Sequence, residues 1–372
     1  MSKRGIFEEV DGPVPATAAP QARAPREARG AIAIWLWLLV GLVAAMVLIG
    51  GMTRLTDSGL SITVWAPVMG AIPPLSQADW EAAFDAYKTT TEFQEQNFWM
   101  TLADFKPIYW WEWGHRQFGR LIGLVWAIGF LAFLATATIP RGWTWRLLLP
   151  GVLGGIQGAV GWWMVVSGLD RLDVASYRLA THLGLAFAIL MLLAWYAMRV
   201  RLDPVTLLQA RRARPPGAGG WTWLLAAAVF LQIVVGALVA GIDAGRGYVD
   251  WPLMQGRFFP EDALALEPWW RNLFESAGLV QFLHRMLGYA VLLLAILVAW
   301  RLAGTGLGQL KARGLWVLAA VLVQVAVGIV TVMNASPWEI AIFHQAGAVV
   351  LVLLLMWARF AALYPAPQRI TA

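Results

Sequence analysis

The sequence predicts an all-α integral membrane protein with eight transmembrane helices. Of its 372 residues, 59% are hydrophobic and only 13% are charged, a balance typical of membrane proteins rather than soluble domains. Its apolar runs reach the length of about 20 residues that a helix needs to cross a bilayer. They do not alternate between apolar and polar residues as the strands of a membrane barrel do.

The eight predicted spans follow one another with polar loops between them. They cover residues 31–52, 114–139, 147–168, 177–198, 221–241, 279–300, 314–333 and 339–360. If the N-terminus is cytoplasmic, most of the 28 lysines and arginines fall on the cytoplasmic side, as the positive-inside rule requires. We therefore expect both termini inside. The net charge of +6 reflects this excess of basic residues on the cytoplasmic side of the membrane lipid. It does not require nucleic acid as a partner.

The chain is an internal repeat of two halves with four spans each. Residues at the ends of the first and fifth spans recur at one constant separation. The matched pairs are Gly50 and Gly236, Asp57 and Asp243, Gly59 and Gly245, and Trp65 and Trp251. In the third and seventh spans, Gln157 and Gly161 match Gln324 and Gly328. Since each half has an even number of spans, the repeat predicts two tandem four-helix bundles related by a pseudo-two-fold axis along the membrane normal.

The repeat divides the chain into five segments. We expect a disordered cytoplasmic tail at 1–30, an N-terminal four-helix bundle at 31–200, a cytoplasmic linker at 201–220, a C-terminal four-helix bundle at 221–363 and a cytoplasmic tail at 364–372. The long outer loops, about 53–112 and 242–278, should pack as lids, with helical pieces at Gln77–Lys88 and Ala263–Phe274. The chain has no cysteine, which excludes disulfides, thiolate ligands and iron–sulfur clusters.

The chain has four histidines, and they form two matched pairs. His115 and His284 each precede an arginine at the start of an even-numbered span, and His182 and His344 lie near the start of the next even-numbered span. All four therefore fall at a similar depth near the outer surface. Two imidazoles from one bundle can ligate a porphyrin iron from opposite faces, so the pattern predicts one bis-histidine haem site in each half.

Other interpretations of the histidines are weaker. One histidine at a helix end is more often a hydrogen-bonding residue than a ligand, but four at one depth are not explained in this way. A zinc site would need cysteines or acids at the same positions. Small residues should give a porphyrin room within the bundles. They are Gly119, Gly123, Gly154, Gly155, Gly158 and Gly161 in the first half, and Gly288 and Gly328 in the second.

One charged position distinguishes the two halves. Glu112 precedes His115 by three residues, and the matching residue in the second half is Gln281. Glu112 is either an acid favoured at a helix N-terminus or a group for proton-coupled chemistry in one half, while the other half only carries electrons. Arg116 and Arg285 are candidate partners of haem propionates, or they extend toward lipid headgroups.

Several motifs resemble those of haem A synthases over roughly residues 30–363. They are GMTRLTDSGLSI at 51–62, WAPVMGAIPPL at 65–75, YWWEWGHR at 109–116, FLHR at 282–285 and IFHQ at 342–345. Some family members carry cysteine pairs in their outer loops. Their absence here resembles the proteobacterial and mitochondrial branch, and the short, arginine-rich inner loops favour a bacterial inner membrane.

The resemblance implies an oxidoreductase that converts the C8 methyl of haem O to a formyl group by successive hydroxylations. The product, haem A, serves terminal cytochrome oxidases. His115 and His182 would bind the haem O substrate, His284 and His344 would bind a resident haem B, and Glu112 would be catalytic. A haem O synthase and an electron-transfer protein are the implied partners.

Two other functions fit the residues alone. A di-haem b-type protein that transfers electrons from quinol would hold two equivalent haems. A haem transporter would need polar or ligating residues along the inner half of the membrane, where the chain has no histidine.

Overall fold

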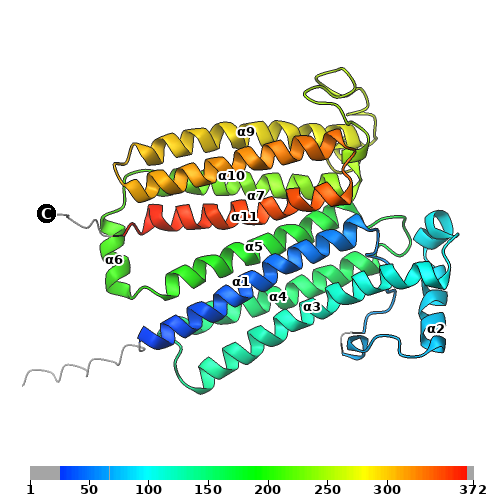
Figure 1. The fold of residues 1–372 in the computed structure, drawn as a ribbon, viewed down its shortest axis with the longest axis horizontal. Coiled ribbons are helices and arrows are strands. Elements are labelled where there is room, and N and C mark those ends of the chain that lie inside the picture. Colours follow the sequence, from blue (N-terminus) through cyan, green and yellow to red (C-terminus); the bar gives the residue numbers. More distant parts are fainter. Residues whose placement is uncertain (1–25, 67, 367–372) are drawn as a thin grey trace, which may run out of the picture.

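The computed structural model describes residues 26–66 and 68–366. Eight of its helices are long and apolar enough to cross a membrane, and the described residues form no β-strand beyond one isolated bridge (Figure 1). The eight are α1 (Arg26–Leu55), α3 (Leu102–Ala135), α4 (Thr144–Val166), α5 (Ser176–Val200), α7 (Ala218–Gly241), α9 (Ala277–Ala303), α10 (Gly308–Met333) and α11 (Trp338–Leu363). The predicted class, all-α with eight spans, is confirmed.

Shorter elements lie in the loops between these helices. They are η1 (Met69–Ala71), α2 (Gln77–Lys88), η2 (Phe93–Asn97), α6 (Pro204–Arg212), η3 (Ala244–Arg246), η4 (Trp269–Arg271) and α8 (Asn272–Glu275). The expected linker at 201–220 thus contains a short helix. Most of the expected N-terminal tail, residues 1–25, lies outside the described residues, as does 367–372 of the C-terminal one.

Helix α3, which corresponds to the second predicted span, is longer than its apolar run. The prediction began it near residue 114, whereas α3 begins at Leu102. A capping box explains this start: Thr101 Oγ1 accepts from the Asp104 backbone N–H, and Asp104 accepts from the Thr101 N–H at 2.9 Å. The added turns extend α3 beyond the other helices (Figure 1), and the first outer loop packs against them.

The two helical pieces expected in the outer loops have different outcomes. The piece at Gln77–Lys88 is confirmed as α2, which begins with a capping box between Ser76 and Asp79. The piece at Ala263–Phe274 is wrong in its first half, because helix begins only at Trp269. Pro268 adopts an extended conformation there and disfavours helix in the residue before it.

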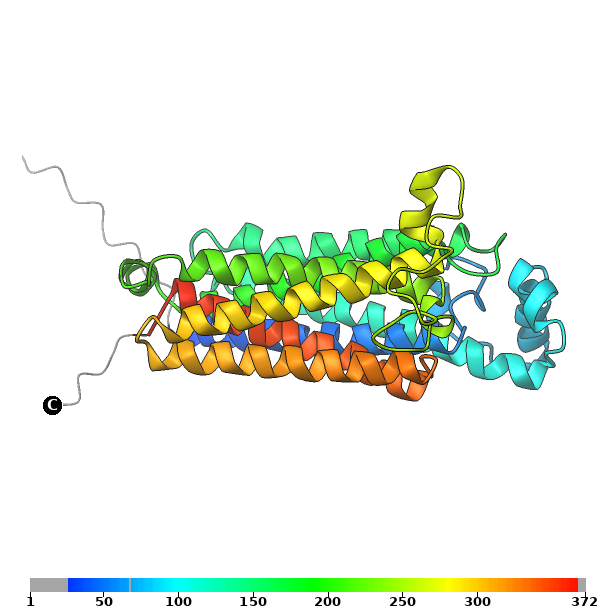
Figure 2. The same ribbon diagram turned by 90° about the horizontal axis from the view of Figure 1, so that it is seen from above.

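Each half of the chain forms its own group of four neighbouring helices (Figures 1 and 2). Helices α1, α3, α4 and α5 pack around one another, and so do α7, α9, α10 and α11. The two groups meet through α5 against α7 and through α11 against α1 and α5. In the most apolar windows of α1, α5 and α11, 44% of residues are buried, against 6% in α3 and α4, which are left to face lipid. A pseudo-two-fold axis would exchange the α1–α11 and α5–α7 contacts; that axis remains a prediction.

Tryptophans join neighbouring helices by donating to backbone carbonyls. The Trp35 indole N–H donates to the Val125 carbonyl at 3.0 Å, and Trp126 donates to Leu147 over the same distance. An indole N–H inside a bilayer needs such a partner, because no water is available there. These bonds fix α1 against α3 and α3 against α4.

The described ends of the chain both lie at the end of the molecule that carries α6, and the long loops lie at the other end (Figure 1). At the loop end, Arg54 joins the two halves: it contacts Asp57 at 2.7 Å, Asp173 at 3.5 Å and Asp243 at 3.1 Å. Asp57 and Asp243 are a matched pair of the repeat. One guanidinium therefore forms ion pairs with carboxylates from both halves where the helices end.

Candidate functional site

All four histidines lie at the outer-loop end of the helices that carry them. His115 is on α3, His182 on α5, His284 on α9 and His344 on α11. These four helices begin at the long-loop end, so the predicted common depth agrees with the topology (Figure 1). The side chains are neither fully buried nor freely exposed.

Each imidazole packs against a glycine on the preceding span. A Cβ added to that glycine would stand 3.2 Å or less from a ring atom, which is tighter than nine in ten real Cβ contacts; at Gly236 and Gly328 the distance, 2.9 Å, is one that real Cβ atoms essentially never show. The pairs are Gly50 with His115, Gly161 with His182, Gly236 with His284 and Gly328 with His344. The repeat is therefore preserved in the packing as well as in the sequence. Gly161 and Gly328 were expected to make room, whereas Gly50 and Gly236 were identified only as markers of the repeat.

Other glycines on the expected list have different surroundings. A Cβ at Gly123, Gly154, Gly155 or Gly158 would meet no atom within 4 Å among those compared. A Cβ at Gly119 would lie 3.4 Å from the Met46 side chain, and a Cβ at Gly288 would lie 3.4 Å from the Gln232 side chain. The close approach of helix to imidazole therefore depends on four glycines rather than on all the small residues of the spans.

The second-half imidazoles are neighbours in an edge-to-face arrangement. The ring centroids of His284 and His344 are 6.4 Å apart, with an angle of 76° between the ring planes. Two imidazoles that ligate one porphyrin iron from opposite faces have ring centres about 6 Å apart, given iron–nitrogen bonds of about 2 Å. This pair therefore fits a bis-histidine haem. In the first half, His115 and His182 make no ring contact of this kind among the described residues; each instead packs against the glycine of its preceding span.

A bare metal ion is a poorer fit than a haem. Among the described residues, no group of three or more histidines, aspartates or glutamates could hold one. Two neutral nitrogen ligands without a third protein ligand do not form a closed or catalytic zinc site. A porphyrin supplies four nitrogen ligands itself and needs only the two axial ones.

Glutamines hold the backbone beside three of the histidines. The Gln157 amide donates to the His182 carbonyl at 2.9 Å, and Gln324 donates to the His344 carbonyl at 2.6 Å. Gln232 donates to the His284 carbonyl at 3.0 Å. The bonds of Gln157 and Gln324 each join two neighbouring helices, α4 with α5 and α10 with α11. Gln232 was missed, although a polar residue in the middle of an apolar span is a usable signal.

Glu112 is buried beneath the first outer loop, with a side chain 3% exposed. Its Oε2 accepts from Ser61 Oγ at 2.8 Å and from the Ile62 backbone N–H at 2.7 Å. Its Oε1 accepts from Arg116 Nη2 at 2.6 Å. A carboxylate with this set of donors is held in one orientation, three residues from His115.

Gln281 takes the matching place in the second half but bonds with opposite polarity. Its amide donates to the Tyr248 carbonyl at 3.0 Å, and Tyr248 matches Ile62 by the constant separation of the repeat. Glu112 accepts from a loop N–H, whereas Gln281 donates to a loop carbonyl. The loops have diverged together with the side chains that they cover, so a carboxylate suits only the first half.

Arg116 and Arg285 bind the outer loops in both halves. Arg116 donates to the Ile62 carbonyl at 2.8 Å, and Arg285 donates to the Tyr248 carbonyl at 2.9 Å. Both guanidinium groups therefore already have acceptors in the protein. They also lie on the side of the bundle where propionates are expected. Their role toward propionates remains a prediction.

The first outer loop forms an aromatic layer over the end of the first bundle. Trp80, Phe84 and Tyr87 of α2 pack against Phe105 and Tyr109 of α3. Glu92 is buried under this layer and accepts from Tyr87 at 3.2 Å. Burial raises the pKa of its carboxyl to about 8. The expectation that this loop packs as a lid agrees with these contacts.

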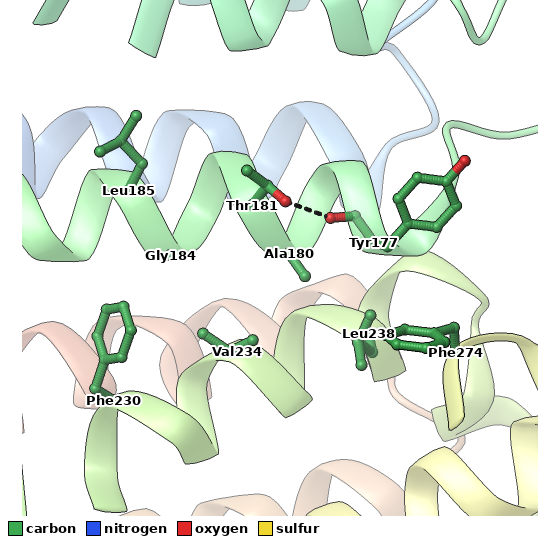
Figure 3. A pocket seen from close by; sticks show the side chains of 9 residues that line it. All are labelled: Tyr177, Ala180, Thr181, Gly184, Leu185, Phe230, Val234, Leu238 and Phe274. Atoms are coloured by element: carbon green, nitrogen blue, oxygen red, sulfur yellow. Dashed lines mark hydrogen bonds between the residues drawn. The ribbon is translucent and has the colours of Figure 1, made fainter. Parts of the chain in front are cut away.

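A groove runs between the halves, along α5 and α7 (Figure 3). It is lined by apolar and small side chains of α5 and α7, including Gly184, Phe230 and Val234. The Thr181 hydroxyl in it already donates to the Tyr177 carbonyl. None of the four histidines lines this groove, so it is separate from the two imidazole pairs.

The sequence of this chain is similar to that of known proteins. The cytochrome oxidase assembly protein family matches residues 33–356. "Heme A synthase" of Dinoroseobacter shibae is 58% identical, covering 98% of this chain and 97% of the relative. Those of Ruegeria pomeroyi and Cereibacter sphaeroides (strain ATCC 17025) are 56% and 50% identical, with 98% of this chain covered in each case. Its duplicated histidines, its eight spans and this identity over nearly the full length show that the chain belongs to the haem A synthase family.

Proposed function

We propose that this protein makes haem A by oxidising the C8 methyl of haem O to a formyl group. The first half, with His115 and His182, binds haem O as substrate. The second half, with His284 and His344, binds a resident haem B. The observation that carries this division is the Glu112/Gln281 difference, because only one half has a carboxylate beside its histidine.

The residues of the second half fit a resident haem. The 6.4 Å separation of the His284 and His344 rings suits two axial ligands, and Gln232 and Gln324 fix the backbone of both. When bound, haem B would supply one-electron transfer. The protein contributes the placement of the two imidazoles.

In the first half, Glu112 has the position and partners of a proton acceptor. With oxygen from water, conversion of the methyl to a formyl group balances as CH₃ + H₂O → CHO + 4 H⁺ + 4 e⁻; the electrons would pass to the proposed electron-transfer partner, and a carboxylate one helical turn from His115 can take up protons. Arg116, Ser61 and the Ile62 N–H hold its two oxygens in place, which keeps the group oriented before the substrate binds. Successive hydroxylation with loss of water is the route that we propose for the methyl group.

A di-haem electron-transfer protein is the alternative. It would need two equivalent sites, whereas the two halves differ at Glu112/Gln281. They also differ in the loop contact of this residue, because Glu112 accepts from a loop N–H and Gln281 donates to a loop carbonyl. We further propose that the chain lies in a bacterial inner membrane with both termini cytoplasmic. The proposed partners are the surrounding lipid, a haem O synthase that supplies the substrate, and an electron-transfer protein.

The test is the pigment made by cells that express this chain. The host should have no haem A synthase of its own and should be compared with and without a haem O source. We expect haem A in the extract only when haem O is supplied, and one haem B retained per purified chain. Two haem B groups per chain with no haem A formed would favour the electron-transfer alternative.

A further inference from the structure

Arg178 lies one helical turn beyond His182, toward the outer surface. It belongs to the first turn of α5, and a spacing of four residues puts both side chains on neighbouring positions of one helix face. Its guanidinium packs over the ring of Trp163 on α4, 4.9 Å from the ring centre. The same two helices carry the contact between Gly161 and His182. Arg178 and His182 thus share the seam between α4 and α5.

The guanidinium of Arg178 is poorly satisfied by the protein. Its Nε and Nη1 atoms are buried and have no hydrogen-bond partner in the part of the chain that the structure describes. A buried N–H without an acceptor costs about as much as a lost hydrogen bond, and the cost is larger for a charged group. Stacking on Trp163 holds the plane of the guanidinium but supplies no acceptor. An anion is the group that would complete it.

The second half has no counterpart of the Arg178–Trp163 pair. The separation that relates His182 to His344 relates Arg178 to Ile340, and the one that relates Gly161 to Gly328 relates Trp163 to Val330. Both the cation and the aromatic ring beneath it are replaced by aliphatic residues. A purely structural arginine at the membrane surface would not need to follow the division between the two haem sites.

We propose that Arg178 binds a propionate carboxylate of haem O and thereby sets the orientation of the substrate; this rests on the proposed function of the first half. Carboxylates pair with guanidinium through two parallel hydrogen bonds, which fixes direction as well as position. On the porphyrin, the C8 methyl neighbours a carbon that bears a propionate. Anchoring that propionate therefore places the methyl that is oxidised. Arg116 is less available for this role, because Glu112 and two loop carbonyls already accept from it.

The test measures haem uptake by the full-length protein with its resident haem in place. Iron protoporphyrin IX and its dimethyl ester are titrated in turn, and the absorbance change that His182→Ala removes is assigned to the first-half site. We expect Arg178→Met to weaken binding of the diacid about tenfold or more and to leave binding of the ester almost unchanged. Arg178→Lys should fall between wild type and Arg178→Met. Arg171→Met, which removes an exposed arginine of the same outer surface, should match wild type.

The outcomes separate this inference from the proposed function. An unaltered resident haem spectrum in Arg178→Met shows that the variant is folded. Equal binding of the diacid by Arg178→Met and wild type would overturn the inference alone. Equal losses for diacid and ester would also overturn it, since they would mean a packing role or a contact with lipid headgroups. If wild type shows no His182-dependent uptake of either compound, both the inference and the assignment of the first-half site fail.

Discussion

The imidazole of His284 lies directly against Gly236, where a Cβ would stand 2.9 Å from its Cε1 atom. The first half repeats this contact between His115 and Gly50, at 3.2 Å from Nε2. In each case a glycine on the first helix of the half allows the second helix to bring its histidine into the bundle. The position of each imidazole is thus limited by a residue on another helix.

Gly236→Ala should therefore reduce the resident haem content. The added methyl group forces the His284 ring or the α7 backbone to move, and overpacking of this kind costs about 1–3 kcal/mol. That cost corresponds to about a 5- to 150-fold loss in affinity if it falls on ligand placement. The measurement is the haem-to-protein ratio of the purified chain, from its absorption spectrum.

Gly220→Ala is the matched control on the same helix. A Cβ at Gly220 would meet no atom within 4 Å among those compared, so this variant should keep a wild-type haem content. Equal haem loss in both variants would point to a general effect on α7 rather than to the contact with His284. Wild-type haem content in Gly236→Ala would contradict the proposed role of the glycine.

Substitution of the histidines should separate the two halves. We expect His284→Ala and His344→Ala to abolish the resident haem spectrum, because each removes one of the two imidazoles proposed to ligate the haem iron. His115→Ala and His182→Ala should keep most of that spectrum and lose haem A formation. The measurements are the absorption spectrum and the haem composition of each purified variant. An equal spectral loss from all four substitutions would contradict the division of labour.

The sequence predicts the spans and the pairing of the histidines because both depend on local composition and on the repeat. It does not predict which helix faces which, because spans such as α7 are apolar on all sides and their periodicity identifies no buried face. The roles of Gly50 and Gly236 depend on those faces, as does the bond from Gln232 to His284. The early start of α3 was missed because the capping residues Thr101 and Asp104 lie outside any apolar run. Arg178 was missed because its significance depends on Trp163, which is on another helix.

Glu112→Gln should keep haem binding and lose haem A formation. A carboxamide cannot take up a proton as a carboxylate does, and loss of an oriented general base typically lowers a rate by about 10²–10⁴-fold. The measurement is the ratio of haem A to haem O in the pigment extract, together with the haem-to-protein ratio. Wild-type haem A formation by the variant would refute the catalytic role.

The packing around Glu112 suggests a control for that experiment. In Glu112→Gln one carboxylate oxygen becomes an NH₂ group, which can no longer accept from Arg116 or from the Ile62 N–H. Ser61→Ala removes one of the bonds to Glu112 and leaves its charge. We expect Ser61→Ala to lower haem A formation by about tenfold, the lower end of the roughly 1.5–3 kcal/mol that a hydrogen bond to a charged group is worth, and by less than Glu112→Gln does. A loss as large as that of Glu112→Gln would mean that loop position, and not the carboxylate, limits the reaction.

Glu92 should make stability depend on pH. Burial raises the pKa of this carboxyl from 4.5 to about 8, so between these values the folded protein keeps a proton that the unfolded chain has released. The folded state then binds more protons than the unfolded state, and its stability falls as the pH rises through this interval. The slope approaches about 1.4 kcal/mol per pH unit and vanishes above the folded pKa. Glu92→Gln keeps an oxygen that can accept from Tyr87 and Asn97, so it should remove this slope with little other change. Thermal unfolding of wild type and variant between pH 5 and pH 9 checks the prediction, and parallel curves would contradict it.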